Sequence, residues 1–200
     1  MVKMLATVCT ILVTVCNAWA LPMAGDYVTM LNDWTVPYSM QDEREGVTYA
    51  TFCLESRNYF NPGTRYLVTS VGENAVGGGG GAVNGQDPVS ESTKWLYAAY
   101  MSDVFKNVAN AAARVQNAIW WLEAEIGGIK ADWDYFQGNF SFDDSGWKVI
   151  AVNLSIDGRT DNQSQLVGVV SPVPEPATML LLGAGLLGLA GVNRKMRQKG

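Results

Sequence analysis

Alternation of apolar and polar positions predicts four β-strands in this chain. Residues 46–56 read GVTYATFCLES, a run rich in β-branched and aromatic side chains with apolar residues on both faces, which is typical of an inner strand. Similar runs predict further strands at 65–71, 146–154 and 164–170. Two of the predicted strands therefore precede the middle of the chain, where the pattern changes, and two follow it.

Apolar positions in the middle of the chain recur at helical spacing instead. They predict one helix from about residue 92 to residue 106 and a second from about residue 108 to residue 126, which ends at two glycines. Strands on both sides of a helical segment predict an α+β fold. We expect a single domain in which antiparallel strands flank a central helical segment.

Two polar stretches are predicted to connect these elements. The stretch 76–88 contains the five glycines 77–81 but lacks the Lys-Ser or Lys-Thr that follows the glycines of a phosphate-binding loop, so we expect a mobile surface loop. Asp157 and Asp161 lie in the stretch 156–163, where their spacing favours turn chemistry over an EF-hand calcium loop.

Both ends of the chain have the pattern of targeting segments. Residues 1–20 combine an early lysine, an apolar run and a final Ala-Trp-Ala, which is typical of a cleaved secretory signal peptide. At the other end, the apolar stretch 177–192 predicts a short transmembrane helix. The basic residues that follow it are expected to stay on the cytoplasmic side and leave the preceding domain outside; they include Arg194, Lys195 and Arg197.

Pro174, Glu175 and Pro176 stand immediately before this apolar stretch. A Pro-Glu-Pro, a short Gly-rich apolar helix and a basic tail, in this order, resemble the PEP-CTERM sorting signal of Gram-negative bacteria that make exopolysaccharide. The resemblance implies cleavage by an exosortase, a transient stay in the inner membrane, and release to the cell surface or extracellular matrix. The predicted organisation is thus a signal peptide at 1–20, a surface domain at 21–170 and a sorting signal at 171–200.

Charge and residue usage exclude several classes of function. Residues 21–174 hold 9 basic and 18 acidic side chains, a net charge of −9, which argues against nucleic acid as a partner. The chain has no histidine, so histidine-dependent catalysis and histidine metal sites are excluded. We expect neither a cofactor nor a metal ion.

Cys53 is the single cysteine that remains after the predicted signal peptide, and it lies in the predicted inner strand. Gln116 lies beside the apolar stripe of the second predicted helix. A thiol held against a carboxamide in a dry pocket can displace ammonia and form an internal thioester. The side chains expected to line such a site are Phe52, Ala112, Ala113, Ile119 and Trp120.

Two short motifs around these residues, FCLE at 52–55 and VQNAIW at 115–120, resemble the signature stretches of the thioester domains of Gram-positive surface adhesins. The resemblance implies that Cys53 and Gln116 form the bond. It also implies a single-use covalent binding module, not an enzyme, which attaches to an amine or hydroxyl of a surface or matrix molecule. Because those adhesins are wall-anchored by a different signal, their host acceptors are not carried over.

Two other functions stay open on the sequence alone. Cys53 can be a buried small apolar residue in a non-covalent structural protein of the surface or matrix. A polysaccharide-acting hydrolase would instead need a carboxylate pair, for which Glu123 with Glu125 or Asp132 with Asp134 are the candidates.

Overall fold

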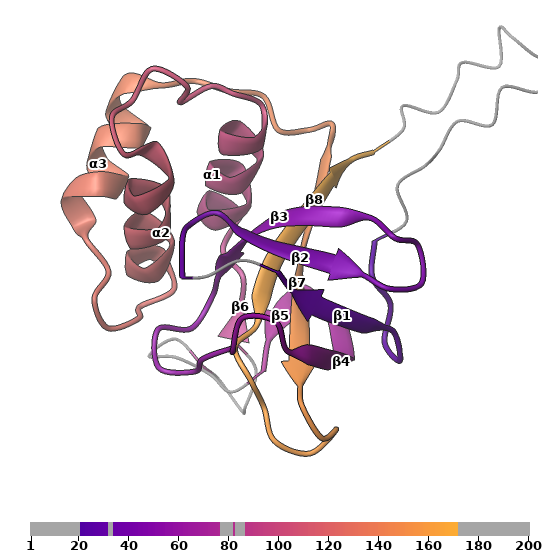
Figure 1. The fold of residues 1–200 in the computed structure, drawn as a ribbon. Helices are drawn as coiled ribbons and strands as arrows, with labels where there is room; N and C mark the ends of the chain where they lie inside the picture. Colours follow the sequence, from indigo (N-terminus) through magenta and orange to yellow (C-terminus); the bar gives the residue numbers. More distant parts are fainter. Residues whose placement is uncertain (1–20, 32–33, 77–81, 83–86, 172–200) are drawn as a thin grey trace, which may run out of the picture.

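The computed structural model describes residues 21–31, 34–76, 82 and 87–171. Within them, six antiparallel strands form a closed barrel in the spatial order β1, β2, β3, β8, β7, β4 (Figure 1). The strands are β1 (Tyr27–Met30), β2 (Tyr38–Asp42), β3 (Thr48–Cys53), β4 (Arg65–Gly72), β7 (Trp147–Ser155) and β8 (Gln165–Val170). A separate pair of short strands is formed by β5 (Asn74–Ala75) and β6 (Asp87–Pro88).

The barrel closes through pairings between strands that are distant in sequence. β1 pairs with β2 on one edge and with β4 on the other, and β4 in turn pairs with β7. β3 pairs with β8 through Phe52 opposite Leu166 and Cys53 opposite Gln165. Because every edge is paired, these six strands leave no exposed edge to template aggregation.

Two apolar cores lie on the two faces of the barrel wall, because successive side chains of a strand point to opposite sides. In β7, Ile150, Val152 and Leu154 belong to the core inside the barrel. Val149 and Ala151 belong to the core between the barrel and the helices. In β3, Cys53 likewise belongs to the core inside the barrel, whereas Phe52 belongs to the core beneath the helices. Both faces of this strand are therefore apolar, as the sequence predicts.

Three helices of the described chain gather on one side of the barrel (Figure 1). They are α1 (Glu91–Met101), α2 (Ala111–Leu122) and α3 (Lys130–Asn139). The Ser90 side chain caps α1 by accepting a hydrogen bond from the Thr93 amide. α1 contacts β7 and β8, and α2 contacts β3, so the helices cover the barrel wall that contains Cys53.

The predicted α+β fold, with strands flanking a central helical segment, is wrong. Strands from both sides of the helices pair with one another and close into one barrel. The sequence pattern also missed β1, β2 and α3. Pairings over such long separations are cross-strand contacts that local periodicity does not encode.

No helix of the described residues is long and apolar enough to span a membrane. The predicted transmembrane helix at 177–192, the signal peptide at 1–20 and the glycines 77–81 lie outside the described residues.

Replacing Gly168 by alanine is expected to lower the free energy of unfolding by about 1–3 kcal/mol, measured by urea denaturation. A Cβ at this position of β8 would meet the Tyr97 ring at 2.7 Å and a Val149 methyl at 3.0 Å. The Tyr97 ring is buried, and its hydroxyl donates to the Ala50 carbonyl oxygen at 2.9 Å, so it has little freedom to move.

Gly138→Ala is the matched control, because nothing approaches the corresponding Cβ position in α3. That variant should be neutral or more stable by up to about 1 kcal/mol. Equal stability of the two alanine variants would contradict the close packing of α1 on β8.

Candidate functional site

Cys53 and Gln116 meet where α2 crosses the end of β3. The Cys53 amide donates to Gln116 Oε1 at 2.9 Å, and Gln116 Nε2 donates to the Cys53 carbonyl oxygen at 2.8 Å. Both residues are buried, with exposed fractions of 1% and 3%. The structure thus brings together two predicted site residues that are 63 positions apart in the sequence.

The Gln116 carboxamide extends the hydrogen bonding of the barrel wall at this point. On one edge of β3, Cys53 is paired with Gln165 of β8. On the other edge of β3, the neighbouring strand β2 begins at Tyr38, which lies opposite Thr51. Cys53 is two residues further along β3 and therefore extends past the end of β2. The Gln116 carboxamide hydrogen-bonds to the backbone amide and carbonyl of Cys53 on this edge, which would otherwise be buried without partners.

The Cys53 side chain lies in the core inside the barrel, next to several polar groups. Gln165 Nε2 donates to Cys53 Sγ at 3.5 Å, and the Tyr38 hydroxyl also hydrogen-bonds to this sulfur. Thr51 Oγ1 donates to Gln165 Oε1 at 2.8 Å and so holds the amide nitrogen toward the sulfur. Burial raises the pKa of the Cys53 thiol, although these hydrogen bonds favour the thiolate in the opposite direction.

Glu55, two residues beyond Cys53, is a buried carboxyl group held by Ser164. The Ser164 amide donates to Glu55 Oε2, and Ser164 Oγ lies 2.6 Å from Glu55 Oε1 and 2.7 Å from Asn153 Oδ1. The Val76 amide donates to Asn153 Oδ1, which identifies that oxygen as an acceptor.

A proton on Glu55 satisfies both contacts of the Ser164 hydroxyl group. Ser164 has one hydroxyl hydrogen, but two acceptor oxygens approach its Oγ. Both contacts are satisfied when Ser164 donates to Asn153 and a protonated Glu55 donates to Ser164. In accordance with this, burial raises the pKa of Glu55 to about 7, and the nearby Glu125 carboxylate adds to the effect.

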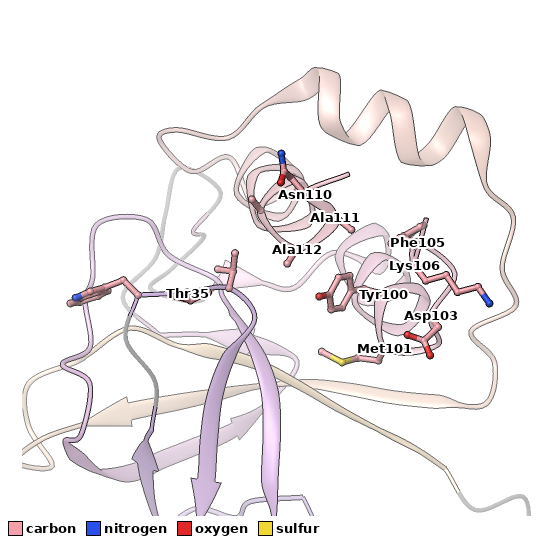
Figure 2. A pocket seen from close by; sticks show the side chains of 12 residues that line it. Thr35, Tyr100, Met101, Asp103, Phe105, Lys106, Asn110, Ala111 and Ala112 are labelled. Carbon is pink, nitrogen blue, oxygen red and sulfur yellow. The ribbon is translucent and has the colours of Figure 1, made fainter. Parts of the chain in front are cut away.

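The predicted lining residues are divided between the two cores and a pocket. Phe52 and Ile119 are fully buried in the core between barrel and helices. Trp120 packs against the core inside the barrel, and its buried indole N–H has no hydrogen-bond partner among the described residues. Ala112 and Ala113 line a surface pocket of about 710 Å³ (Figure 2).

The acidic pairs considered for hydrolysis are each engaged with their own partners. Glu123 accepts hydrogen bonds from Ser90 at the start of α1, and burial raises its pKa. Glu125 Oε2 accepts from the amide and hydroxyl of Ser56. Asp132 pairs with Arg114 at 2.6 Å, and Asp134 pairs with Lys130 on an exposed surface. The contacts of Glu123, Glu125 and Asp132 connect different segments of the fold, whereas Lys130 and Asp134 pair within α3. The second oxygen of Glu125, Oε1, is buried and has no hydrogen-bond partner among the described residues.

Asp157 is part of a turn, as the sequence predicts. Its carboxylate accepts from the amides of Arg159 and Thr160, and these hydrogen bonds lower its pKa to about 2. Within the described part of the chain, no group of three or more Cys, Asp or Glu residues is placed to hold a metal ion.

Tyr38, Thr51, Glu55 and Gln165 surround the Cys53 region, but the sequence did not single them out. One signal was available for Thr51, which shares a face of β3 with Cys53 by alternation. Another was Gln165, a polar residue at the start of an otherwise apolar strand. Their proximity depends on the pairing of β3 with β8.

Comparison with known proteins identifies the C-terminal segment. Residues 172–195 match the family model of the PEP-CTERM protein-sorting motif. The chain therefore carries a sorting motif that implies an exported protein, handled at the membrane and processed by an exosortase. Neither the curated proteins nor the solved structures include a match to this chain.

Proposed function

We propose that this exported protein attaches covalently, once per molecule, to a surface or matrix partner through an internal thioester between Cys53 and Gln116. The observation that carries the proposal is the pair of buried hydrogen bonds between the Gln116 carboxamide and the Cys53 backbone. The carbon that would form the thioester is the Gln116 carboxamide carbon, and both the oxygen and the nitrogen that make these hydrogen bonds are attached to it. It is therefore held beside the residue that supplies the thiol.

The chemistry needs the groups that are present at this position. The Cys53 sulfur attacks the Gln116 carboxamide carbon, a C–S bond replaces the C–N bond, and ammonia leaves with the thiol proton. A partner amine or hydroxyl then attacks the same carbon. Its proton passes to the Cys53 sulfur as the C–S bond breaks. Burial of both residues protects the thioester from hydrolysis.

Two further features support this proposal. Cys53 is the single cysteine of residues 21–174, so no other thiol competes as nucleophile. Burial raises the pKa of its thiol, and hydrogen bonds from Gln165, Tyr38 and Gln163 to the sulfur oppose this rise, which reduces the cost of forming the thiolate. The motifs FCLE and VQNAIW, which resemble those of the adhesin thioester domains, contain both residues of the pair.

The test is the intact mass of the purified protein, before and after incubation with methylamine. We expect the wild type to be lighter than its sequence mass by one ammonia. Methylamine should then add its whole mass and release a thiol that can be titrated. The variants Cys53→Ala and Gln116→Ala should both have their full sequence mass, and neither should react with methylamine. A full wild-type mass, together with no methylamine adduct at any stage of purification, would contradict the thioester.

Two observations favour a non-covalent structural role for the same exported protein. Burial raises the pKa of the Cys53 thiol, and the carboxamide hydrogen bonds already give Gln116 a structural role. In that case the thiol becomes reactive only on unfolding. The same mass experiment separates the two functions.

A further inference from the structure

The Cys53 sulfur lies in the apolar core inside the barrel, yet polar side chains contact it there. Gln165 Nε2 donates a hydrogen bond to Cys53 Sγ at 3.5 Å, and the Tyr38 hydroxyl donates another. Gln165 is fully buried, and Tyr38 is only 7% exposed. The sulfur therefore faces two hydrogen-bond donors at a position that is closed to solvent.

The two donors come from the strands on either side of β3. Tyr38 begins β2 and lies opposite Thr51, whereas Gln165 begins β8 and lies directly opposite Cys53. Residues that face one another on antiparallel strands are close in space, and alternate residues of a strand share a face. The pairing of the barrel strands thus brings both donors to the sulfur.

Both donors are held in place by further contacts. Thr51 Oγ1 donates to Gln165 Oε1 at 2.8 Å, which keeps the amide nitrogen of Gln165 toward the sulfur. The Tyr38 ring packs edge-on against Phe60, with ring centroids 5.0 Å apart. Burial raises the pKa of Tyr38, so its hydroxyl group keeps its proton and remains a donor. The donors are therefore in position before any reaction begins.

A hydrogen bond to sulfur gains strength when the sulfur becomes charged. The neutral sulfur of a thiol or a thioester is a weak acceptor. A thiolate carries a negative charge, and hydrogen bonds to ionised groups are roughly twice as strong as neutral ones. Donors fixed beside the sulfur therefore stabilise the state in which a C–S bond breaks more than the state before it.

We propose that Tyr38 and Gln165 are catalytic residues of the covalent attachment and stabilise the Cys53 sulfur as the leaving group. This role rests on the proposed Cys53–Gln116 thioester. When a partner amine or hydroxyl attacks the Gln116 carbon, the electron pair of the C–S bond goes to the sulfur. The two donors hold this charge until the proton of the attacking group reaches the sulfur. The products are an amide or ester at Gln116 and a free Cys53 thiol.

The test measures how fast methylamine opens the thioester, from the intact mass of the full chain over time. Tyr38→Phe removes one donor and keeps the ring, and it should slow opening by about tenfold or more. Gln165→Met removes the other donor and should have an effect of similar size. Tyr66→Phe is the matched control. Its ring is buried in the same core, but its hydroxyl accepts from the Asn61 amide at 2.7 Å, so the opening rate should not change.

Hydrolysis of the thioester, measured without methylamine, breaks the same C–S bond and should slow by the same factor in Tyr38→Phe. A change confined to methylamine would indicate altered access of the amine and overturns the proposal. Gln165→Met also leaves the Thr51 hydroxyl without its acceptor, so folding of each variant is checked by urea unfolding. If Gln165→Met does not fold, the rates of Tyr38→Phe decide the question.

The outcomes separate the role of the donors from the thioester itself. If the wild type loses ammonia but both variants open at its rate, the role of the donors is overturned and the thioester stands. If ammonia loss disappears in Gln165→Met and persists in Gln116→Ala, Gln165 supplies the acyl group and both proposals are overturned. If the wild type keeps its ammonia, the thioester fails, and the role that rests on it fails as well.

Discussion

Replacing Gln116 by alanine is expected to lower the free energy of unfolding by about 3–5 kcal/mol, even when no thioester can form. The substitution leaves the amide and carbonyl of Cys53 buried without the partners they now have at 2.9 Å and 2.8 Å. It also opens a cavity between α2 and β3. The measurement is urea unfolding of Gln116→Ala made in the Cys53→Ala background.

The same substitution made in the presence of Cys53 reports on the cross-link. A thioester between Cys53 and Gln116 would close a loop of about 60 residues, which adds roughly 4 kcal/mol if loop entropy acts as it does in a disulfide. Gln116→Ala should therefore cost more with Cys53 present than in the Cys53→Ala background. An equal cost in both backgrounds indicates that the bond is absent. Gln137→Ala, on the exposed face of α3, is the control and should change stability by less than about 0.5 kcal/mol.

Replacing Glu55 by glutamine is expected to stabilise the protein at pH 8 by up to about 3 kcal/mol and to have little effect at pH 5. Burial raises the pKa of Glu55 to about 7, above that of the unfolded chain. The folded state therefore binds the proton more tightly. The stability that this proton contributes is complete below about pH 4.5 and is lost as the pH rises through 7.

Glutamine can reproduce the hydrogen bonds of the protonated acid. Its carbonyl oxygen accepts from the Ser164 amide, and its amide nitrogen donates to Ser164 Oγ, which in turn donates to Asn153. Urea unfolding from pH 5 to pH 8 should show a decline for the wild type and a flatter profile for Glu55→Gln. The exposed Glu43→Gln variant should follow the wild type. A Glu55→Gln profile parallel to that of the wild type would show that another group titrates.

Much of the local structure followed from residue patterns. The run around Cys53 predicted an inner strand, and β3 is paired on both edges inside the barrel. Two helices with the expected apolar stripes are present, and the order of features at the C-terminus identified the sorting motif. Periodicity and short motifs act within a few residues, so a single sequence is sufficient to reveal them.

Closure of the barrel was decided by tertiary structure. β1 contains four residues and β2 five, too short for their alternation to stand out from the surrounding polar segments. Their place in the barrel follows from pairing of β1 with both β2 and β4, and of β3 with β8. Such pairings depend on side chains that lie far apart in the sequence, so no local window contains them.

The same distinction applies to the candidate site. From the sequence alone, Cys53 and Gln116 were identified as a thiol and a carboxamide able to react, because those properties belong to the residue types. Tertiary structure decided that Gln116 binds the backbone of Cys53, and that Gln165 and Tyr38 hydrogen-bond to its sulfur. It also decided that Glu55 meets Ser164 and Asn153. The physical reason is that burial and hydrogen-bond partners exist only once β3, β7, β8 and α2 have packed together.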